Sequence, residues 1–339
     1  MIDYLELKVP CRHAQFGETH GRIDGNDVNR RWRKWETLKG PKTGGVVNVR
    51  SIGGGADVLI KGNPAEYFQG HNLFGTSRTV DLAVDWIIAV LQQLNIRPSG
   101  DEIERWILGN VQVRRVDIAE NFRLSSARMV RSVIREEAFC LMEQGRSVST
   151  YPKFKTIYYQ QYSRRWAVKL YDKGAKPGIK AAISKKTVLR KLEKYAQGKV
   201  RVELCLRKPE LSRKGLDVLS AWRELQPRKI LKARLSRLHL TSSRLVPVAS
   251  GPAHQLKSME RVVAQVHNDG HDLKDFLDPR TLKRYRKRFA ELGLTFDRKR
   301  LRGVGGVTLF DALSEISRVK GIPAWARAAG LFYAPSSRA

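Results

Sequence analysis

The segment Thr156–Lys173, TIYYQQYSRRWAVKLYDK, decides the fold of this chain because it has the pattern of a β-hairpin. From Arg165 onward apolar and polar residues alternate, and successive side chains of a strand point to opposite faces of a sheet. The apolar positions, predicted to face a core, are Trp166, Val168 and Leu170. The opposite positions, predicted to form a half-exposed face, are Arg165, Lys169, Tyr171 and Lys173. The strand therefore presents a tyrosine among cations.

Tyr171 admits two interpretations. A phenol on a positively charged face can attack a phosphodiester once a metal ion or a lysine lowers the cost of forming the phenolate. Tyrosine is also a good strand former, so Tyr171 could be a structural residue on a basic surface. The hairpin alone favours the structural interpretation, and the rest of the chain has to decide between the two.

The chain carries a large excess of positive charge, with 64 Lys and Arg against 33 Asp and Glu in 339 residues, a formal net charge of +31. Such an excess repels itself in a compact protein and is typical of chains that bind a polyanion, of which nucleic acid is the first candidate. A chain of this length can bury a large core and is expected to divide into two domains.

Neither a membrane nor a nucleotide cofactor is an expected partner. The sequence has no apolar run approaching the roughly 18 residues that span a bilayer, no lipidation motif and no basic amphipathic helix with a Trp, Phe and Leu face. The triple glycine Gly53–Gly55 has no GK[ST] or GxGxxG context, which argues against nucleotide hydrolysis. Three widely spaced cysteines, and a start, MIDYLELKVP, that does not resemble a signal peptide, predict a cytoplasmic location.

Strands with one apolar and one polar face alternate with amphipathic helices over residues 1–240. The predicted strands are 2–9, 46–52, 56–61, 111–122 and 199–207, together with the hairpin at 156–173. The predicted helices are 80–94, 103–108, 127–142, 185–196, 211–225 and 228–240. No element is assigned to the polar and basic residues 11–42. This pattern predicts an α+β fold with an antiparallel-rich central sheet and flanking helices.

Two acids fall on the polar faces of predicted strands, Asp117 and Glu203. Carboxylates are the ligands that Mg²⁺ and Mn²⁺ prefer, so together they predict a divalent metal site. The alternative is that both acids form salt bridges with neighbouring cations, namely Arg115, Arg201 or Lys169. Each acid alone favours the salt bridge, whereas their combination with a nucleophilic tyrosine favours the metal.

The C-terminal part of the chain is predicted to be a separate basic region. We expect a catalytic domain at 1–240, a linker at 241–255 that contains Pro and Gly, and a basic helical accessory region at 256–339. A helix at 279–292 carries a DNA-binding face, with the candidate residues Lys283, Arg284, Lys287 and Arg288. The alternative for this face is a solvated basic helix. Residues 303–339 show no chemistry that can be named.

Five segments together resemble a known family. They are MIDYLELKVP at 1–10, GNPAEYFQGHNLFGT at 62–76, VRRVDIAENF at 113–122, SRRWAVKLYDKG at 163–174 and VRVELCLRK at 200–208. In this order they resemble the gene-two-type rolling-circle replication initiators of filamentous bacteriophages. The resemblance implies a degenerate HUH- or Rep-like nuclease fold. It also implies a sequence-specific nick in the plus-strand origin, covalent capture of the 5′ phosphate on tyrosine, and later rejoining.

The resemblance also assigns roles to residues of this chain. Tyr171 matches the nucleophilic tyrosine, although the nearby Tyr158, Tyr159 and Tyr162 leave a second nucleophile open. Asp117 and Glu203 match recurring acidic positions and are the metal-ligand candidates, with His71 as a weaker third. The His-hydrophobic-His metal motif of the wider superfamily is absent. Lys173 would lower the tyrosine pKa or stabilise the leaving oxygen, or attract phosphate generally. The cations predicted to contact DNA on the sheet are Arg115, Arg164, Arg165, Lys169 and Arg201.

The partners that the resemblance implies are phage origin DNA, both supercoiled duplex and single-stranded. A host replicative helicase, a polymerase and a single-strand-binding protein would complete the reaction in the bacterial cytoplasm, with Mg²⁺ or Mn²⁺ as cofactor. Two other classes stay open. A non-catalytic basic DNA-binding regulator needs the charge alone, and an RNA-binding or packaging protein would use the hairpin aromatics as a stacking platform.

Overall fold

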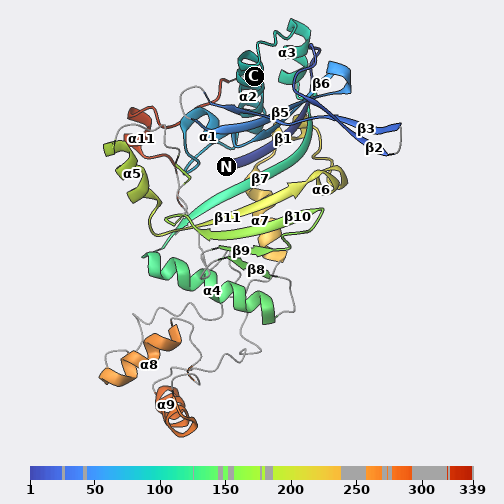
Figure 1. Cartoon of the computed structure of the whole chain (residues 1–339). Helices are drawn as coiled ribbons and strands as arrows, with labels where there is room; N and C mark the ends of the chain where they lie inside the picture. The colour runs from blue at the N-terminus through green and yellow to red at the C-terminus, as the bar shows by residue number, and fades with distance from the viewer. Residues whose placement is uncertain are drawn as a thin grey trace.

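The centre of the molecule is a nine-stranded sheet with the strand order β4-β5-β6-β1-β7-β11-β10-β9-β8 (Figure 1). Every neighbouring pair in it is antiparallel. The computed structural model describes residues 1–24, 27–40, 44–124, 126–143, 148–151, 156–175, 178–179, 186–237, 257–268, 273, 277–291, 319 and 321–337. The predicted α+β class is confirmed, and the predicted linker at 241–255 lies outside the described residues.

Seven of the nine strands of the sheet were predicted, and the exceptions are β4 and β8. The nine strands are β1 Ile2–Pro10, β4 Glu36–Lys39, β5 Val46–Ile52, β6 Asp57–Gly62, β7 Gln112–Arg123, β8 Val148–Tyr151, β9 Thr156–Tyr159, β10 Trp166–Asp172 and β11 Lys199–Arg207. A separate two-stranded sheet consists of β2 Thr19–Asp24 and β3 Asp27–Arg33. The sequence did not reveal β2, β3, β4 and β8, because these segments are short or mostly polar and show no clear apolar face.

The helices of the described chain lie in the sequence between the strands and after the last strand, β11. They are α1 Pro64–Gln69, α2 Thr79–Gln93, α3 Gly100–Ile107, α4 Ala127–Glu143, α5 Lys186–Ala196, α6 Lys208–Arg213, α7 Pro227–Arg237, α8 Ser258–Asn268, α9 Pro279–Glu291 and α11 Ala324–Ala328. The predicted helix at 211–225 is wrong. The chain instead forms α6 and a 3₁₀ turn at Leu219–Trp222, because Gly215 has a φ of 64° and ends the helix there.

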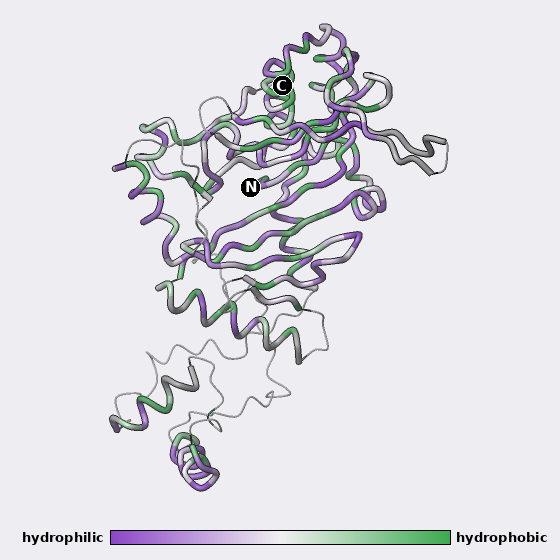
Figure 2. The backbone as a smooth tube through the Cα atoms, in the orientation of Figure 1, coloured by the Kyte–Doolittle hydropathy of each residue, from purple (hydrophilic) through white to green (hydrophobic). Residues whose placement is uncertain are grey.

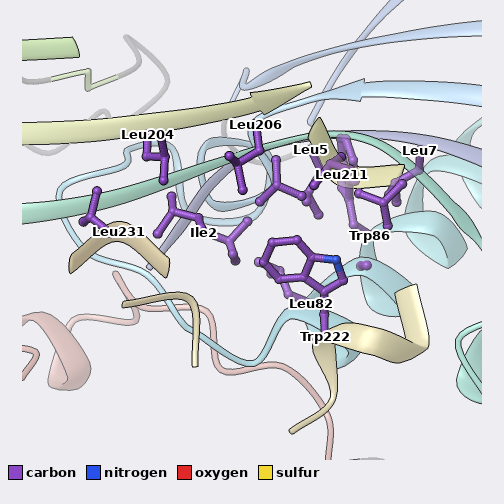
Figure 3. Close-up of a cluster of buried hydrophobic side chains, with 14 of the residues drawn as sticks. Ile2, Leu5, Leu7, Leu82, Trp86, Leu204, Leu206, Leu211, Trp222 and Leu231 are labelled. Carbon is purple, nitrogen blue, oxygen red and sulfur yellow. The ribbon is translucent and has the colours of Figure 1, made fainter. Parts of the chain in front are cut away.

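The main hydrophobic core lies between one face of the sheet and the helices α2, α6 and α7. Figure 3 shows Ile2, Leu5, Leu7, Leu204 and Leu206 of the sheet against Leu82, Trp86, Leu211, Trp222 and Leu231. Hydrophobic and hydrophilic residues alternate along the central strands in Figure 2. The apolar half of each strand therefore builds the core, and the polar half is left to the opposite face.

Residues 321–337, part of the predicted accessory region, pack against the N-terminal elements. The ring of Tyr333 stacks on Phe68 with centroids 3.9 Å apart, and its hydroxyl donates to Asp85 Oδ2 of α2 at 2.7 Å. The Tyr333 N–H donates to Gln69 Oε1 at 2.9 Å. The C-terminal segment therefore packs against both α1 and α2 and stabilises their positions.

The helices α8 and α9 share a small core of their own, formed by Val263, Ala264, Leu273, Leu282, Tyr285 and Phe289. The apolar side of α9, with Leu282, Tyr285 and Phe289, therefore faces this core. In the part of the chain that the structure describes, none of the helices has the length and apolar character needed to cross a membrane.

Trp86 is expected to be a major source of stability because its side chain is fully buried. Replacing Trp86 by Ala should lower the free energy of unfolding by about 3–5 kcal/mol, measured by urea denaturation. The control is Leu108→Ala, at a side chain that is 58% exposed, which should change it by less than about 0.5 kcal/mol. Equal effects of the two variants would contradict the described core.

Candidate active site

The polar face of the sheet gathers the predicted site residues where β7, β11 and β10 are neighbours. The register of β10 and β11 places Lys169 opposite Glu203, and Tyr171 follows Lys169 on the same face. On β7, Asp117 is opposite Cys205, so it lies diagonally from Glu203. Antiparallel pairing therefore brings the predicted tyrosine and both predicted acids to one surface.

Glu203 is the centre of this cluster. Its Oε1 accepts hydrogen bonds from the Tyr171 hydroxyl at 2.7 Å and from Arg201 Nε at 3.0 Å, and its Oε2 accepts from Lys169 Nζ at 2.9 Å. Burial alone would raise the pKa of Glu203, but the charges of Lys169 and Arg201 and these hydrogen bonds lower it to about 2. Glu203 is therefore an ionised carboxylate whose two oxygens are both in use.

Tyr171 is buried, not half-exposed as the sequence predicted, with 4% of its surface accessible. Lys169 Nζ lies 4.3 Å from its ring centroid and Lys173 Nζ lies 5.7 Å from it. Burial raises the pKa of Tyr171 well above its ordinary value. Arg201 opposes this shift, whereas the acids Glu203 and Asp3 add to it. The phenol is therefore protonated and donates to Glu203.

Arg201 is fully buried, which contradicts its predicted role as a DNA contact. Besides Glu203, its guanidinium donates to Asp3 Oδ1 and to the backbone carbonyl of Asn72. A guanidinium removed from water needs a hydrogen-bond acceptor for each of its N–H donors. Here β1, β11 and the segment before α2 supply acceptors. Arg201 is therefore a buried residue that holds the acids of the site in place.

Asp3, Asn63 and Asn72 belong to the site, but sequence reasoning missed them. Asp3 Oδ1 accepts from Asn63 Nδ2 at 3.0 Å and from Asn72 Nδ2 at 2.9 Å, in addition to Arg201. Simple alternation along β1 does not place Asp3 beside Arg201, because a bulge changes the direction of its side chain. The sequence signal was that MIDYLELKVP, which contains Asp3, and GNPAEYFQGHNLFGT, which contains both asparagines, both belong to the family resemblance.

Lys173 directly follows β10 and lies against Asn72 and Gly178. Its side chain is buried, and its Nζ donates to Asn72 Oδ1 at 2.6 Å. Gly178 has a φ of +64°, and a Cβ there would lie 2.4 Å from Asn72 Oδ1, so glycine lets this backbone approach closely. Burial first, and then the charge of Arg201, lower the pKa of Lys173 to about 7 against the opposing effect of Asp3.

Asp117 is paired with Arg115 on its own strand. Arg115 Nε donates to Asp117 Oδ1 at 2.8 Å, and a terminal guanidinium nitrogen donates to Oδ2 at 2.7 Å. The same guanidinium lies over the ring of Tyr4, 4.5 Å from its centroid. Both oxygens of Asp117 are therefore occupied, as they are in Glu203. These are the ion pairs that the sequence offered as the alternative to a metal.

His71 is fully buried. Its Nδ1 lies 3.4 Å from the Leu73 backbone nitrogen, which donates to it, and its ring packs edge-on against Phe74. Burial lowers the pKa of His71 to about 4, although the backbone of Leu331 has the opposite effect. The imidazole is neutral, and these contacts place it in the segment that covers the site.

The three predicted metal ligands do not fit a common ion in this arrangement. Across the described residues, no group of three or more His, Cys, Asp and Glu side chains is placed to hold a metal. The oxygens of Asp117 and Glu203 accept from Arg115, Arg201, Lys169 and Tyr171. Cations of the protein occupy the positions where a metal would bind these acids, so the predicted metal stays a prediction.

The remaining cations that the sequence predicted as DNA contacts differ in their surroundings. Arg164 is exposed, whereas Arg165 pairs with Glu210 of α6 at 2.8 Å and not with the residues around Tyr171. On α9, Arg288 pairs with Glu260 of α8 at 3.5 Å, and the other predicted contacts, Lys283, Arg284 and Lys287, are exposed. The α9 face therefore keeps most of its predicted positive charge in solvent.

Comparison with known proteins places this chain in a family of replication-associated proteins. A family model that describes the N-terminal region of the replication-associated gene-two protein matches residues 1–225. The chain belongs to this gene-two protein family, which confirms the resemblance to gene-two-type phage initiators. The replication-associated gene-two protein of Enterobacteria phage I2-2 is 26% identical over 316 residues, 87% of this chain and 87% of that protein.

One solved structure is also similar, that of a rolling-circle replication initiator protein from Geobacillus stearothermophilus. The similarity covers 73% of this chain and 88% of that chain, with a TM-score of 0.34 and 12% sequence identity. A TM-score of this size does not establish a shared fold. The family is therefore shown by sequence, and the α+β architecture by the strand pairing of this chain.

The ionised form of Glu203 is expected to stabilise the folded protein. Because its pKa is lowered from 4.5 to about 2, this contribution is complete above about pH 4.5 and is lost as the pH falls toward 2. The difference in unfolding free energy between wild type and Glu203→Gln should therefore shrink by up to about 2 kcal/mol from pH 4.5 to pH 3. Urea denaturation of both proteins at several pH values measures this difference in unfolding free energy. A difference that does not change with pH would contradict the described ion pairs.

Proposed function

We propose that this chain nicks one strand of a phage replication origin and captures the 5′ phosphate on Tyr171. The observation that carries the proposal is the Tyr171 hydroxyl, which donates to the Glu203 carboxylate at 2.7 Å within a group of cations. Membership of the replication-associated gene-two protein family supports a role in initiating rolling-circle replication. The net charge of +31 supports a nucleic acid as the substrate.

In the proposed step, Tyr171 Oη forms a bond to the scissile phosphorus while its proton passes to Glu203, its hydrogen-bond acceptor. The bond from phosphorus to the 3′ oxygen breaks. The leaving oxygen takes up a proton, for which the Lys173 ammonium is the proposed donor. The products are a 5′-phosphotyrosyl ester and a 3′ hydroxyl. Attack by a 3′ hydroxyl on this ester rejoins the strand without a nucleotide, because the ester keeps the energy of the broken bond.

Cations around Glu203 would stabilise the negative charge that develops on the phosphate. Lys169 is only partly buried and sits beside the Tyr171 ring, so its ammonium can meet an incoming phosphate oxygen. Tyr171 itself is almost inaccessible, so the proposal requires that origin DNA displaces the segments covering the site. The raised pKa of Tyr171 supports a proton transfer that accompanies attack and does not precede it.

The proposed DNA contacts are exposed or partly buried cations of β7, of β10 and the turn before it, and of α9. They are Arg115, Arg164, Arg165, Lys169, Lys283, Arg284, Lys287 and Arg288. Phosphate contacts of this kind position a duplex without reading its sequence. Supercoiled and single-stranded origin DNA are the proposed substrates, and a host helicase, a polymerase and a single-strand-binding protein are the proposed partners in the bacterial cytoplasm.

Replacing Tyr171 by Phe is expected to abolish covalent linkage to DNA, since Phe has no oxygen to form the ester. The measurement is incubation with supercoiled DNA carrying the phage origin, followed by detection of open circles and of protein bound to the 5′ end. DNA affinity should stay within about twofold of wild type, because a single hydroxyl makes a small contribution to a salt-dependent interface.

The control variants make the same chemical change at neighbouring tyrosines, Tyr158→Phe and Tyr162→Phe. The side chain of Tyr162 is 83% exposed, so its hydroxyl is free of the cluster around Glu203. Both controls should nick and link at wild-type rates. Normal linkage by Tyr171→Phe would make Tyr171 structural. Binding without cleavage by the wild type would favour the non-catalytic DNA- or RNA-binding alternative.

A requirement for Mg²⁺ or Mn²⁺ is proposed from the family resemblance alone, and none of the steps above depends on it. The resemblance predicts that EDTA stops nicking of supercoiled origin DNA and that excess Mg²⁺ or Mn²⁺ restores it. Conversion of supercoiled to open-circular DNA on a gel is the measurement. Nicking that continues in EDTA would mean that the protein's own cations are sufficient.

A further inference from the structure

Asp3 is a buried acid that the proposed chemistry leaves without a role. It lies on β1, and in the sheet β7 separates this strand from β11. Pairing of β1 with β7 places Ile2 opposite Ile118 and Tyr4 opposite Asp117, so Asp3 is the extra residue of a β-bulge. A bulge re-aims a side chain, and here it directs Asp3 onto the polar face.

A single oxygen of Asp3 joins three other side chains. Oδ1 accepts from Asn72 Nδ2 at 2.9 Å, from Asn63 Nδ2 at 3.0 Å and from Arg201. These donors come from β11, from the N-cap of α1 and from the segment that follows α1. Asp3 is therefore the common acceptor of three elements around the site.

Two chains of contacts lead from Asp3 to the reacting groups. In the first, Arg201 donates from Nη2 to Asp3 and from Nε to Glu203 at 3.0 Å, and Glu203 accepts the Tyr171 hydroxyl. A planar guanidinium whose three nitrogens are held by Glu203, Asp3 and the Asn72 carbonyl fixes the orientation of the carboxylate it binds. In the second chain, Asn72 donates to Asp3 and accepts from Lys173 Nζ at 2.6 Å.

We propose that Asp3 is a positioning residue for the nicking reaction, which orients Tyr171 through Arg201 and Glu203 and orients Lys173 through Asn72. This inference rests on the proposed function. The hydrogen bonds of Asp3 are to Arg201, Asn63 and Asn72, so it acts through residues that hold the proposed proton acceptor and proton donor. The competing explanation is that Asp3 only neutralises the buried charge of Arg201 and so keeps the protein folded.

The first test is Asp3→Asn, which keeps the size of the side chain and removes its charge. Its maximal rate of covalent linkage at saturating origin DNA should fall by on the order of 10- to 100-fold, the cost of misplaced reacting groups. The dissociation constant for origin DNA should stay within about twofold of wild type. The matched control is Asp57→Asn of β6, whose carboxylate pairs with Lys8 of β1 at 3.1 Å outside the network, and its maximal rate should be unchanged.

The second test does not remove the charge and so avoids unfolding. Asn63 caps α1 through Oδ1, which accepts from the Glu66 N–H at 3.0 Å, and reaches Asp3 through Nδ2. Because serine is also a good N-cap, Asn63→Ser keeps the cap and removes only the donor to Asp3. The maximal rate should fall about threefold, as for one lost hydrogen bond, with the same DNA affinity and thermal midpoint.

The outcomes separate this inference from the proposed function. If wild type forms the Tyr171 adduct and Asn63→Ser links at the wild-type rate, the inference is overturned even where Asp3→Asn fails to fold. If a folded Asp3→Asn variant loses DNA affinity and linkage rate equally, Asp3 only neutralises the buried charge of Arg201 and the inference is wrong. Absence of an adduct in wild type would overturn the proposed function and, with it, this inference.

Discussion

The burial of Arg201 constrains the rest of the polar face. An ion removed from water costs several kcal/mol unless it is paired and fully hydrogen-bonded, and here Asp3 and Glu203 supply the two negative charges. These acids lie on β1 and β11, so the order β1-β7-β11 and the bulge in β1 are tied to the position of one guanidinium. The polar face is therefore constrained by charge as strictly as the opposite face is by packing.

The same constraint explains why segments far from the sheet take part in the site. Asn63 and Asn72 contact Asp3, and Gln69, which lies between them in the chain, accepts from the backbone of Tyr333. The C-terminal segment thus contacts α1, next to the two asparagines that donate hydrogen bonds to Asp3. A residue near the end of the chain is connected in this way to the environment of Tyr171.

The arrangement around Tyr171 is that of a shielded, protonated phenol. Its hydroxyl donates to a carboxylate that Lys169 and Arg201 keep ionised. Coulomb attraction is strong in this buried site, and it pairs the acids with cations of the protein. Across the described residues, the acids do not form a common metal-binding group. In the proposed reaction, binding of DNA would have to redistribute these internal ion pairs.

The sequence by itself determined the α+β class, the attraction to polyanions, the family and the face that Tyr171 shares with Glu203. These follow from composition, ordered motifs and the period-two geometry of strands. The short polar strands β2–β4 carried no such signal, because their pairing depends on backbone hydrogen bonds that every sequence can form. Only the tertiary structure decided that Tyr171 and Arg201 are buried and that Asp3, 198 residues from Arg201 in the chain, is turned toward it by a one-residue bulge. Burial and such long-range contacts depend on how all the strands pack together, which no local pattern of residues specifies.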